Sequence, residues 1–406
     1  MESVIIYTKQ FPFGLRESYL LDEIPLLREK FDLIFFYPYA EFEFNYDTAR
    51  LKEDHQIKIL NFNLAPKNIN LSSRLLFSFN ASKLLIREII FSRQGIMGLK
   101  RIKQNFQRLY HFAAQAQILG RWLQEQSGKF IHYHYWLHDG LVISEMSSIA
   151  KRQPHFARAH SIDLYHKDWP LGGYLPFEKI KLKLAKRIYS VSKHGLAYLR
   201  ANHPQWDFKF NYQPLGVSLD HQPIIQQPLP KILTISFIGK VKNLNRMIEF
   251  MKLLKQDFTW VHIGSGTKES EAQLIDDCNK ENISFEYLGY LTKTQINSYL
   301  TKNQMAFFAN TSSWEGVPVS MMEAGIYGIP FIATAIPGNL EIVNPTNGFI
   351  MPLTGDLQKL ADQISFCYKN EKIWKTTAVE AQKTIFTQYN AQNNYSVFFD
   401  EIKTIA

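Results

Sequence analysis

The chain has 406 residues, which is more than one hydrophobic core normally serves, so two domains are expected. Its 46% hydrophobic and 20% charged residues exclude a disordered chain, and its two cysteines exclude a disulfide framework. The formal net charge of +9 favours an anionic partner.

Short apolar runs bounded by turns predict six strands in the first half of the chain. They cover residues 4–7, 32–37, 57–60, 130–134, 156–159 and 188–191. Helices are expected over 16–29, from Asp139 onward and up to Leu199, the last one capped by Ser192. Strands that alternate with helices predict a parallel sheet covered on both faces.

The same alternation begins again after the polar, proline-containing stretch 222–230. Here the predicted strands cover 233–238, 260–263, 283–288, 305–308 and 330–333, and the predicted helices 245–254, 320–327 and 357–370. Two such series predict an α/β protein with two Rossmann-like domains, 1–213 and 214–387. Because ligands bind beyond the carboxyl ends of parallel strands, two facing domains would enclose a cleft between them.

The amino terminus lacks the charged region and the cleavage site of a signal peptide, and no run of 18 apolar residues is present. A cytoplasmic protein is therefore expected.

Positive charge is concentrated in residues 65–125, which contain ten basic and only two acidic residues interleaved with apolar ones. This pattern suits a helix on an anionic membrane surface, peripheral to the inner face. It equally suits a half-buried helical pair with a solvated basic face. Nucleic acid is disfavoured, because no sequence signature of a nucleic-acid-binding module is present.

Several catalytic motifs are absent: the P-loop, the G-x-S-x-G elbow, H-E-x-x-H and the Asp-x-Asp pair of metal-dependent sugar transferases. Gly264-Ser-Gly266 follows a predicted strand but lacks the third glycine of a dinucleotide fingerprint. His132, His134 and His138 lie within seven residues, but no carboxylate or thiol stands nearby at ligand spacing, so ordinary core or cleft histidines are favoured over a metal site.

Residues 312–328 contain the clearest chemical signal. A predicted strand leads into a loop with Glu315, and a helix then begins near Val319 with Glu323 inside it. The start of a helix attracts anions, whereas a carboxylate beside a phosphate must bind neutral hydroxyls instead. This arrangement predicts a nucleotide-sugar site, with Lys240 and Lys242 to neutralise the diphosphate. The alternative is a loop with two surface glutamates around a helix start.

The order of further motifs resembles the retaining glycosyltransferases of family 4, which have the GT-B fold. The matching blocks are Phe237–Asn243, Val261–Gly266, Phe285–Gly289, Ser313–Pro318 with Glu323-Ala324, Gly328–Pro330, Pro337-Gly338, Glu341–Val343 and Asn347-Gly348. The first half is similar to a branch associated with capsule, exopolysaccharide and O-antigen synthesis, through Phe11–Gly14, Glu17, Tyr135-Trp136, Arg158–Tyr165 and Tyr189–Ser192.

This resemblance implies a role for each matching residue. Glu323 would hold the ribose, Glu315 the hydroxyls of the donor sugar, and His160 would contact that sugar near the reacting carbon. The implied catalytic set is His160, Glu315 and Lys240. The implied donor-binding set is Gly14, Gly239, Lys240, Lys242, Tyr287, Leu288, Glu315, Gly316, Val317, Pro318, Val319, Ser320 and Glu323, and the acceptor or cleft set is Arg158, Asp163, Tyr135 and Trp136.

Two features depart from the family pattern. Lysine stands at 240 where arginine is more common, and the loop that follows is shorter than usual. The resemblance also implies a last helix, about 388–406, that packs back on the first domain.

The expected activity is sugar transfer from a nucleoside diphosphate sugar, UDP favoured over GDP, to a saccharide or lipid-linked saccharide acceptor. Retained configuration, no metal and no cofactor are expected. The rivals are a non-catalytic, membrane-associated binding protein and another enzyme on this fold, a nucleotide-sugar epimerase or a sugar phosphorylase. The sequence names neither the sugar nor the oligomeric state.

Overall fold

The computed structural model describes residues 2–13, 17–40, 51–61, 71–91, 99–165, 175–219, 222–254 and 257–406. Two compact units divide the chain: Met1–Gln213 together with Ser396–Ala406, and Pro214–Tyr395. The chain therefore returns to the first unit at Ser396.

The first unit is built on a parallel sheet of seven strands in the order β3-β2-β1-β4-β5-β6-β7. The strands are β1 (Ser3–Thr8), β2 (Leu33–Pro38), β3 (Ile57–Ile59), β4 (Phe130–His134), β5 (His155–Ala159), β6 (Arg187–Ser190) and β7 (Phe210–Tyr212). Every residue of β1, β4 and β5 is buried, as the nearly continuous apolar runs of a doubly covered sheet require.

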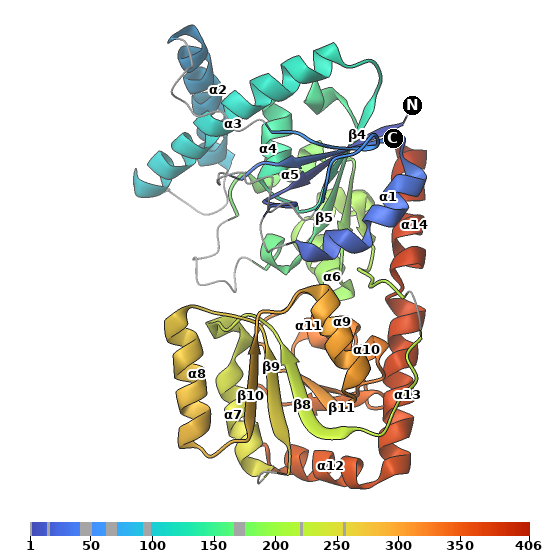
Figure 1. Cartoon of the computed structure of the whole chain (residues 1–406). Helices are drawn as coiled ribbons and strands as arrows, with labels where there is room; N and C mark the ends of the chain where they lie inside the picture. Colours follow the sequence, from blue (N-terminus) through green and yellow to red (C-terminus); the bar gives the residue numbers. More distant parts are fainter. Residues whose placement is uncertain are drawn as a thin grey trace. The chain divides into compact units, whose positions relative to one another are not determined.

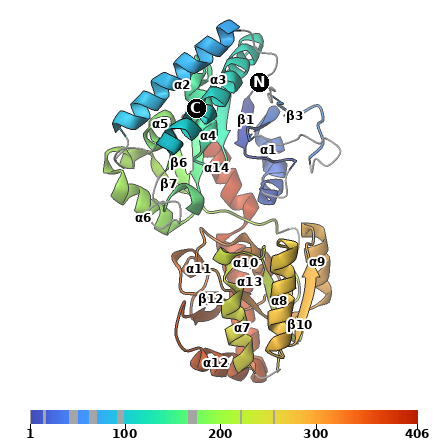
Figure 2. The same ribbon diagram turned by 90° about the vertical axis from the view of Figure 1, so that its left-hand side faces the viewer.

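Helices cover both faces of this sheet. They are α1 (Ile24–Lys30), α2 (Leu71–Phe91), α3 (Leu99–Glu125), α4 (Asp139–Met146), α5 (Glu178–Leu184), α6 (Lys193–Asn202) and α14 (Ala391–Ile405). Figure 1 and Figure 2 show α2 and α3 on one side of the sheet and α1 with the end of α14 on the other. The pair α2 and α3 buries Leu84, Leu85, Leu109 and Phe112, so the basic region 65–125 includes a half-buried helical pair.

The helix predicted over 16–29 is interrupted. A 3-10 turn over Ser18–Asp22 precedes α1, and Glu17 adopts a left-handed backbone conformation with a φ of 62°. Pro25 stands in the first turn of α1, where its missing N–H has no intrahelical partner to lose. A helix running through residue 25 would have lost a hydrogen bond at that position.

The carboxyl-terminal helix α14 completes the first unit. Phe398, Phe399 and Ile402 are fully buried, and the Tyr189 hydroxyl donates to Glu401 Oε1 at 3.0 Å. Lys30 Nζ lies 2.9 Å from Asp400 Oδ1. The helix is thus part of the core of the first unit.

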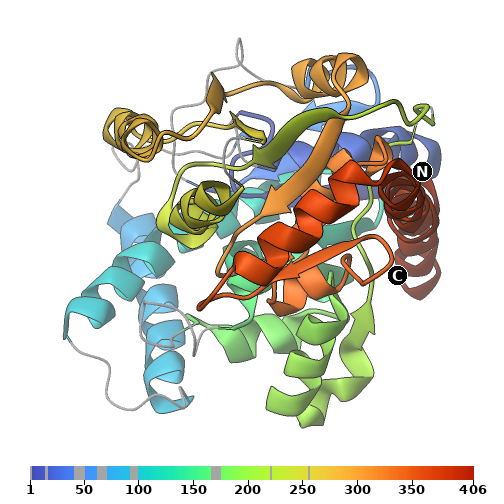
Figure 3. The same ribbon diagram turned by 90° about the horizontal axis from the view of Figure 1, so that it is seen from below.

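The second unit has a parallel sheet of six strands in the order β10-β9-β8-β11-β12-β13. The strands are β8 (Leu229–Ile235), β9 (Thr259–Ile263), β10 (Phe285–Gly289), β11 (Met305–Asn310), β12 (Phe331–Thr334) and β13 (Gly348–Met351). Its helices are α7 (Leu244–Leu253), α8 (Lys268–Lys280), α9 (Lys293–Lys302), α10 (Val319–Ile326), α11 (Pro337–Leu340), α12 (Gln358–Lys369) and α13 (Glu371–Gln388). Figure 3 shows these strands with helices on either side.

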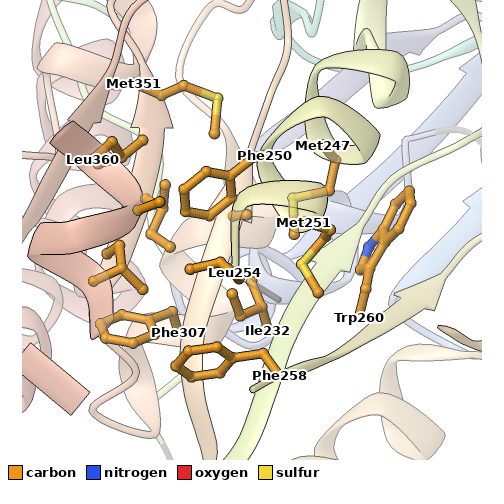
Figure 4. Packing of buried hydrophobic residues seen from close by; sticks show 14 of the residues in the cluster. Ile232, Met247, Phe250, Met251, Leu254, Phe258, Trp260, Phe307, Met351 and Leu360 are labelled. Atoms are coloured by element: carbon orange, nitrogen blue, oxygen red, sulfur yellow. The ribbon is translucent and has the colours of Figure 1, made fainter. Parts of the chain in front are cut away.

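A hydrophobic core of this unit lies between the sheet and the helices α7, α12 and α13 (Figure 4). Its two buried tryptophans satisfy their indole N–H groups. Trp260 donates to Thr234 Oγ1 and Trp374 to the carbonyl of Ala306, both at 2.8 Å. Each donor is paired, so the aromatic surface is buried without leaving an unbonded polar group.

The strand predicted at 233–238 lies earlier than expected, as β8. Residues 236–238 have left the strand, but they keep hydrogen bonds to the loop after β9, from Ser236 N to Ile263 O and from Ile238 N to Ser265 O. This early exit exposes Phe237 and begins the loop that carries the predicted phosphate lysines.

Candidate functional site

In the second sheet the strand order reverses between β8 and β11, the two central strands. Ligands of doubly wound sheets bind at the carboxyl ends of strands at such a point. The loop after β8 contains a 3-10 turn over Lys240–Lys242, and the loop after β11 contains residues 311–318. Both predicted donor-binding segments therefore begin at this point.

Hydrogen bonds hold these two loops together. The Thr311 hydroxyl donates to the carbonyl of Lys242 at 2.8 Å. The backbone N–H of Ser313 donates to the carbonyl of Val241 at 2.9 Å. Because these hydrogen bonds are made to the backbone of residues 241 and 242, they fix the backbone from which the side chains of Lys240 and Lys242 project, whatever those side chains bind.

An ion pair joins Lys242 and Glu315 within this site. The same carboxylate oxygen, Glu315 Oε1, accepts a hydrogen bond of 2.8 Å from the Ser312 hydroxyl. Only 18% of the lysine side chain and 15% of the glutamate side chain are exposed. The two residues assigned to the diphosphate and to the donor sugar are thus direct partners.

The loop after Glu315 packs closely against the start of α11. A Cβ atom on Gly338 would lie 2.2 Å from the carbonyl oxygen of Gly316, so position 338 has no room for a side chain. Pro318 precedes α10, and no side chain caps that helix. Val319 and Ser320 form its first turn, where backbone N–H groups have no intrahelical acceptor.

The remaining donor-site residues of the second unit lie around this loop. Lys240 is exposed, Gly239 and Glu323 are half-buried, and Val317 is buried. Glu323 lies one turn inside α10, so it follows the helix start at which an anion would bind.

The predicted base-recognition segment lies on β10. Tyr287 and Leu288 are half-buried, and the ring of Tyr287 stacks on His262 with a centroid separation of 6.1 Å. Burial, with the Glu271 carboxylate as a further contribution, raises the pKa of Tyr287 to about 12. Gly264, at the end of β9, has a φ of +139° and would place a Cβ 1.8 Å from Ser236 O, so only glycine fits.

In the first sheet the strand order reverses between β1 and β4. Here the buried carboxylate of Glu17 accepts three backbone hydrogen bonds of 2.9 Å, from Lys9, Gln10 and Phe11. It also accepts a hydrogen bond from the indole N–H of Trp136, which follows β4. Glu17 therefore ties together the loops after β1 and β4.

His160 follows β5 and packs on Trp136, with ring centroids 4.4 Å apart. Its Nε2 lies 3.1 Å from the carbonyl of Tyr135, so Nε2 carries the proton and donates. Burial, with the charge of Arg158 as a further contribution, lowers the pKa of His160 to about 3, and the ring is neutral near pH 7. The backbone N–H of His160 donates to Asp163 Oδ2 at 3.0 Å, which makes Asp163 a positioning residue.

Arg158 and Tyr135 are placed differently from the expected acceptor contacts. Both side chains are fully buried, and Arg158 forms an ion pair with Glu23, which is also fully buried. The guanidinium lies 4.5 Å from the ring centre of Phe398 on α14. The structure assigns Arg158 to the core of the first unit, because no part of it is accessible to an acceptor.

The histidines considered as metal ligands are embedded around the sheet. His132 Nδ1 lies 2.7 Å from the hydroxyl of Tyr7, and His134 Nε2 lies 3.0 Å from Nδ1 of His155. In the part of the chain that the structure describes, no three His, Cys, Asp or Glu side chains form a metal-binding group. Gly14, expected to contact the donor, lies outside the described residues.

Comparison with known proteins places the second unit in a family. Residues 220–384 match the family model described as Glycosyl transferases group 1. The second unit carries a glycosyl transferases group 1 domain.

Two relatives of known name also match the chain in sequence. The chain is 24% identical over 212 residues to the amylovoran biosynthesis glycosyltransferase AmsK of Erwinia amylovora, a match covering 49% of this chain and 50% of that protein. It is 22% identical over 163 residues to the 2-deoxystreptamine N-acetyl-D-glucosaminyltransferase of Niallia circulans, covering 38% and 41%. The chain thus matches at most half the length of these relatives.

The fold is shared over the whole chain. The structure of Anabaena HepE in complex with UDP and glucose aligns with a TM-score of 0.70 and 15% identity, covering 100% of both chains. The predicted class, two Rossmann-like α/β domains of the GT-B type, is confirmed.

Proposed function

We propose that the protein is a retaining, metal-independent glycosyltransferase that uses a nucleoside diphosphate sugar. The observation that carries this proposal is the joined pair of loops at the β8 and β11 ends, with Lys242 and Glu315 in contact inside a group 1 domain. Cation and carboxylate are the groups that a diphosphate and sugar hydroxyls would each need.

Each residue of this site has a separate role in the proposed transfer. The Glu323 carboxylate accepts hydrogen bonds from the ribose hydroxyls, and the Glu315 carboxylate accepts hydrogen bonds from hydroxyls of the donor sugar. Lys240, Lys242 and the N–H groups at the start of α10 stabilise the negative charge that develops on the departing diphosphate. These two lysines would take the part that a divalent ion plays in metal-dependent transferases.

Neutral His160 contacts the donor sugar near the reacting carbon in this proposal. Its Nε2–H is bound to a backbone carbonyl, which fixes the ring and leaves Nδ1 without a proton. The ring therefore contributes position and polarity instead of charge. The acceptor hydroxyl attacks the anomeric carbon from the side of the leaving group while the bond from that carbon to the diphosphate oxygen breaks. The proton of the hydroxyl passes to the departing diphosphate, so the configuration is retained and no protein nucleophile is needed.

UDP is the favoured nucleotide, and surface polysaccharide synthesis, capsule included, is the favoured setting. HepE, which shares the fold, has been solved with UDP and glucose. The name of AmsK assigns it to amylovoran biosynthesis. A saccharide or lipid-linked saccharide is the acceptor in this proposal.

Peripheral contact with an anionic membrane is a further part of the proposal. The outer face of α2 exposes Phe79 (67%) and Ile86 (55%), with exposed Lys83 between them. Exposed apolar side chains beside basic ones match an anionic lipid surface. None of the helices in the described ranges is long and apolar enough to cross a membrane.

Sedimentation with phosphatidylglycerol vesicles tests this contact. Phe79→Ser should reduce the bound fraction severalfold, whereas Phe366→Ser, which removes a similarly exposed ring (64%) from α12 of the second unit, should not. Equal binding of both variants and the wild type would exclude the α2 face as the contact.

Calorimetric titration with UDP and with GDP, in the absence of metal, tests the donor site. We expect UDP to bind, and Glu323→Gln to weaken that binding while Glu380→Gln on α13 leaves it unchanged. Analysis by NMR of the anomeric configuration in the product of a UDP-sugar reaction tests retention. Binding of neither nucleotide would favour a non-catalytic protein on this fold.

A further inference from the structure

A cavity of about 600 Å³ lies in the first unit, beside the carboxyl ends of β1, β2 and β4. Lys9 follows β1, Tyr39 follows β2, and Asp139 begins α4 after β4. Arg108 and Gln115 come from α3, two turns apart, and close the cavity from the helical side. The cavity is therefore formed by residues far apart in the sequence at the ligand-binding edge of the sheet.

Its lining combines two cationic side chains, Lys9 and Arg108, with one carboxylate, Asp139. The carboxylate is already engaged, since Arg108 forms an ion pair with it and His138 Nδ1 lies 3.0 Å from Oδ2. Burial opposes ionisation of Asp139, but His138, Arg108 and Lys181 outweigh it and hold the pKa of this carboxyl well below its usual range. Lys9 is half-buried, and no ion pair within the described ranges engages its ammonium, which can therefore bind an anion.

Three oxygen atoms of the lining lack a hydrogen-bond partner among the described residues: the Tyr39 hydroxyl, Gln115 Oε1 and Asp139 Oδ1. These residues are only 5%, 8% and 4% exposed. The side-chain amide nitrogen of Gln115 donates to the carbonyl of Tyr39 at 3.2 Å, so the unbonded atom of this amide is its oxygen, Oε1. A buried polar group without a partner costs about 1–3 kcal/mol, and hydroxyl groups of a ligand would satisfy all three atoms.

The cavity is linked to the proposed position of His160 through stacked side chains. Lys9 Nζ lies 4.9 Å from the ring centre of Trp136, whose ring packs on His160 at 4.4 Å. A sugar in the cavity would therefore lie near the residue that meets the donor.

We propose that this cavity binds the acceptor, and that the acceptor is an anionic sugar. Its hydroxyls bind Tyr39, Gln115 and Asp139, and its phosphate or carboxylate binds Lys9 and Arg108. This assignment rests on the proposed glycosyltransferase function and adds the chemical class of the acceptor to it.

Ligand-observed NMR titrations of the full chain, in the presence of excess UDP, test the assignment. The excess UDP keeps phosphate-bearing probes out of the donor site. The probes are glucose 1-phosphate, glucuronic acid and uncharged methyl α-glucoside. We expect at least one charged probe to bind tenfold more tightly than the neutral one. Binding of glucose 1-phosphate alone indicates the phosphate of a lipid-linked sugar, and binding of glucuronic acid alone indicates an acidic saccharide.

Lys9→Gln and Arg108→Gln should each weaken binding of the charged probe about tenfold, the effect of one charge-assisted hydrogen bond. Lys103→Gln, an exposed position on the same helix, is the matched control and should bind as the wild type does. Lys9 is half-buried and unpaired with Asp139, so its variant remains informative even if Arg108→Gln fails to fold.

Three results would overturn the assignment: equal affinity for the neutral probe, no binding of either charged probe, or variants that bind as the wild type does. A titration of the wild type with UDP in the same preparation separates the two proposals. UDP binding without binding of charged probes refutes the acceptor class alone, whereas absence of UDP binding counts against the glycosyltransferase itself.

Discussion

Glu315→Gln removes the carboxylate that pairs with Lys242 while keeping the shape of the side chain. This carboxylate pairs with the ammonium group that the diphosphate of UDP needs in the proposed function, so the two compete for Lys242. The ion pair between Lys242 and Glu315 is partly exposed to solvent, so breaking it costs UDP binding about 1 kcal/mol. The variant should therefore bind UDP about fivefold more tightly than the wild type does.

The companion variants separate competition from direct binding. Lys242→Gln should bind UDP about tenfold more weakly, since one charge-assisted contact to phosphate is lost. In that background Glu315→Gln should have a smaller effect, because no ammonium remains to be released. Transfer of sugar should nevertheless fall at least tenfold in Glu315→Gln, since the donor sugar loses its hydroxyl acceptor.

Calorimetric titration with UDP measures the affinities, and release of UDP from a UDP-sugar measures transfer. Glu380→Gln, which removes the carboxylate of the exposed Lys383–Glu380 pair, is the control and should change neither. If Glu315→Gln weakens UDP binding instead, the carboxylate supports the nucleotide and the competition argument is wrong.

Three further variants or conditions test other parts of the molecule. Glu323→Gln should lower kcat/KM at least tenfold, about 1.4 kcal/mol, and a wild-type rate would remove the ribose assignment. Arg158→Met leaves the fully buried carboxylate of Glu23 without its cation and should cost about 3–5 kcal/mol in urea unfolding; a loss below 1 kcal/mol would contradict the core assignment. Burial lowers the pKa of His132 to about 4, whereas an unfolded histidine titrates near 6.5, so the folded state takes up protons less readily. The stability that neutral His132 contributes is fully present above pH 6.5, and the free energy of unfolding should fall by about 2 kcal/mol between pH 7 and pH 5. A free energy of unfolding that does not change over that interval would contradict the lowered pKa of His132.

The sheets could be predicted well from the sequence because their central strands are continuous apolar runs. The helices α8 and α9 were not predicted, since their faces are largely polar and only Leu274, Cys278, Ile296 and Leu300 are buried along them. The short strand β13 was also missed, because half of its residues are not buried. Weak apolar periodicity therefore explains these omissions.

The site could be predicted in its residues but not in its contacts. Motif resemblance assigned Lys242 and Glu315 to one donor, yet their direct pairing joins positions 73 residues apart. Arg158 was misassigned for a similar reason, since its partner Glu23 lies 135 residues away in the sequence and nothing local shows that both are buried. Glu17 was noted only as part of a motif. Its carboxylate accepts four hydrogen bonds because the loop after β1 folds around it, and the sequence does not show that fold.

Helix α14 also determines the order in which the chain can fold during synthesis. The second unit is one continuous segment, so it can fold as soon as its own residues are made. The first unit cannot, because Phe398, Phe399 and Ile402 complete its core and are synthesised after the whole of the second unit. Until then the buried pair of Arg158 and Glu23 lacks its cover by the ring of Phe398. A nascent chain without α14 is consequently expected to be a target for chaperones through its first unit, although that unit is translated first.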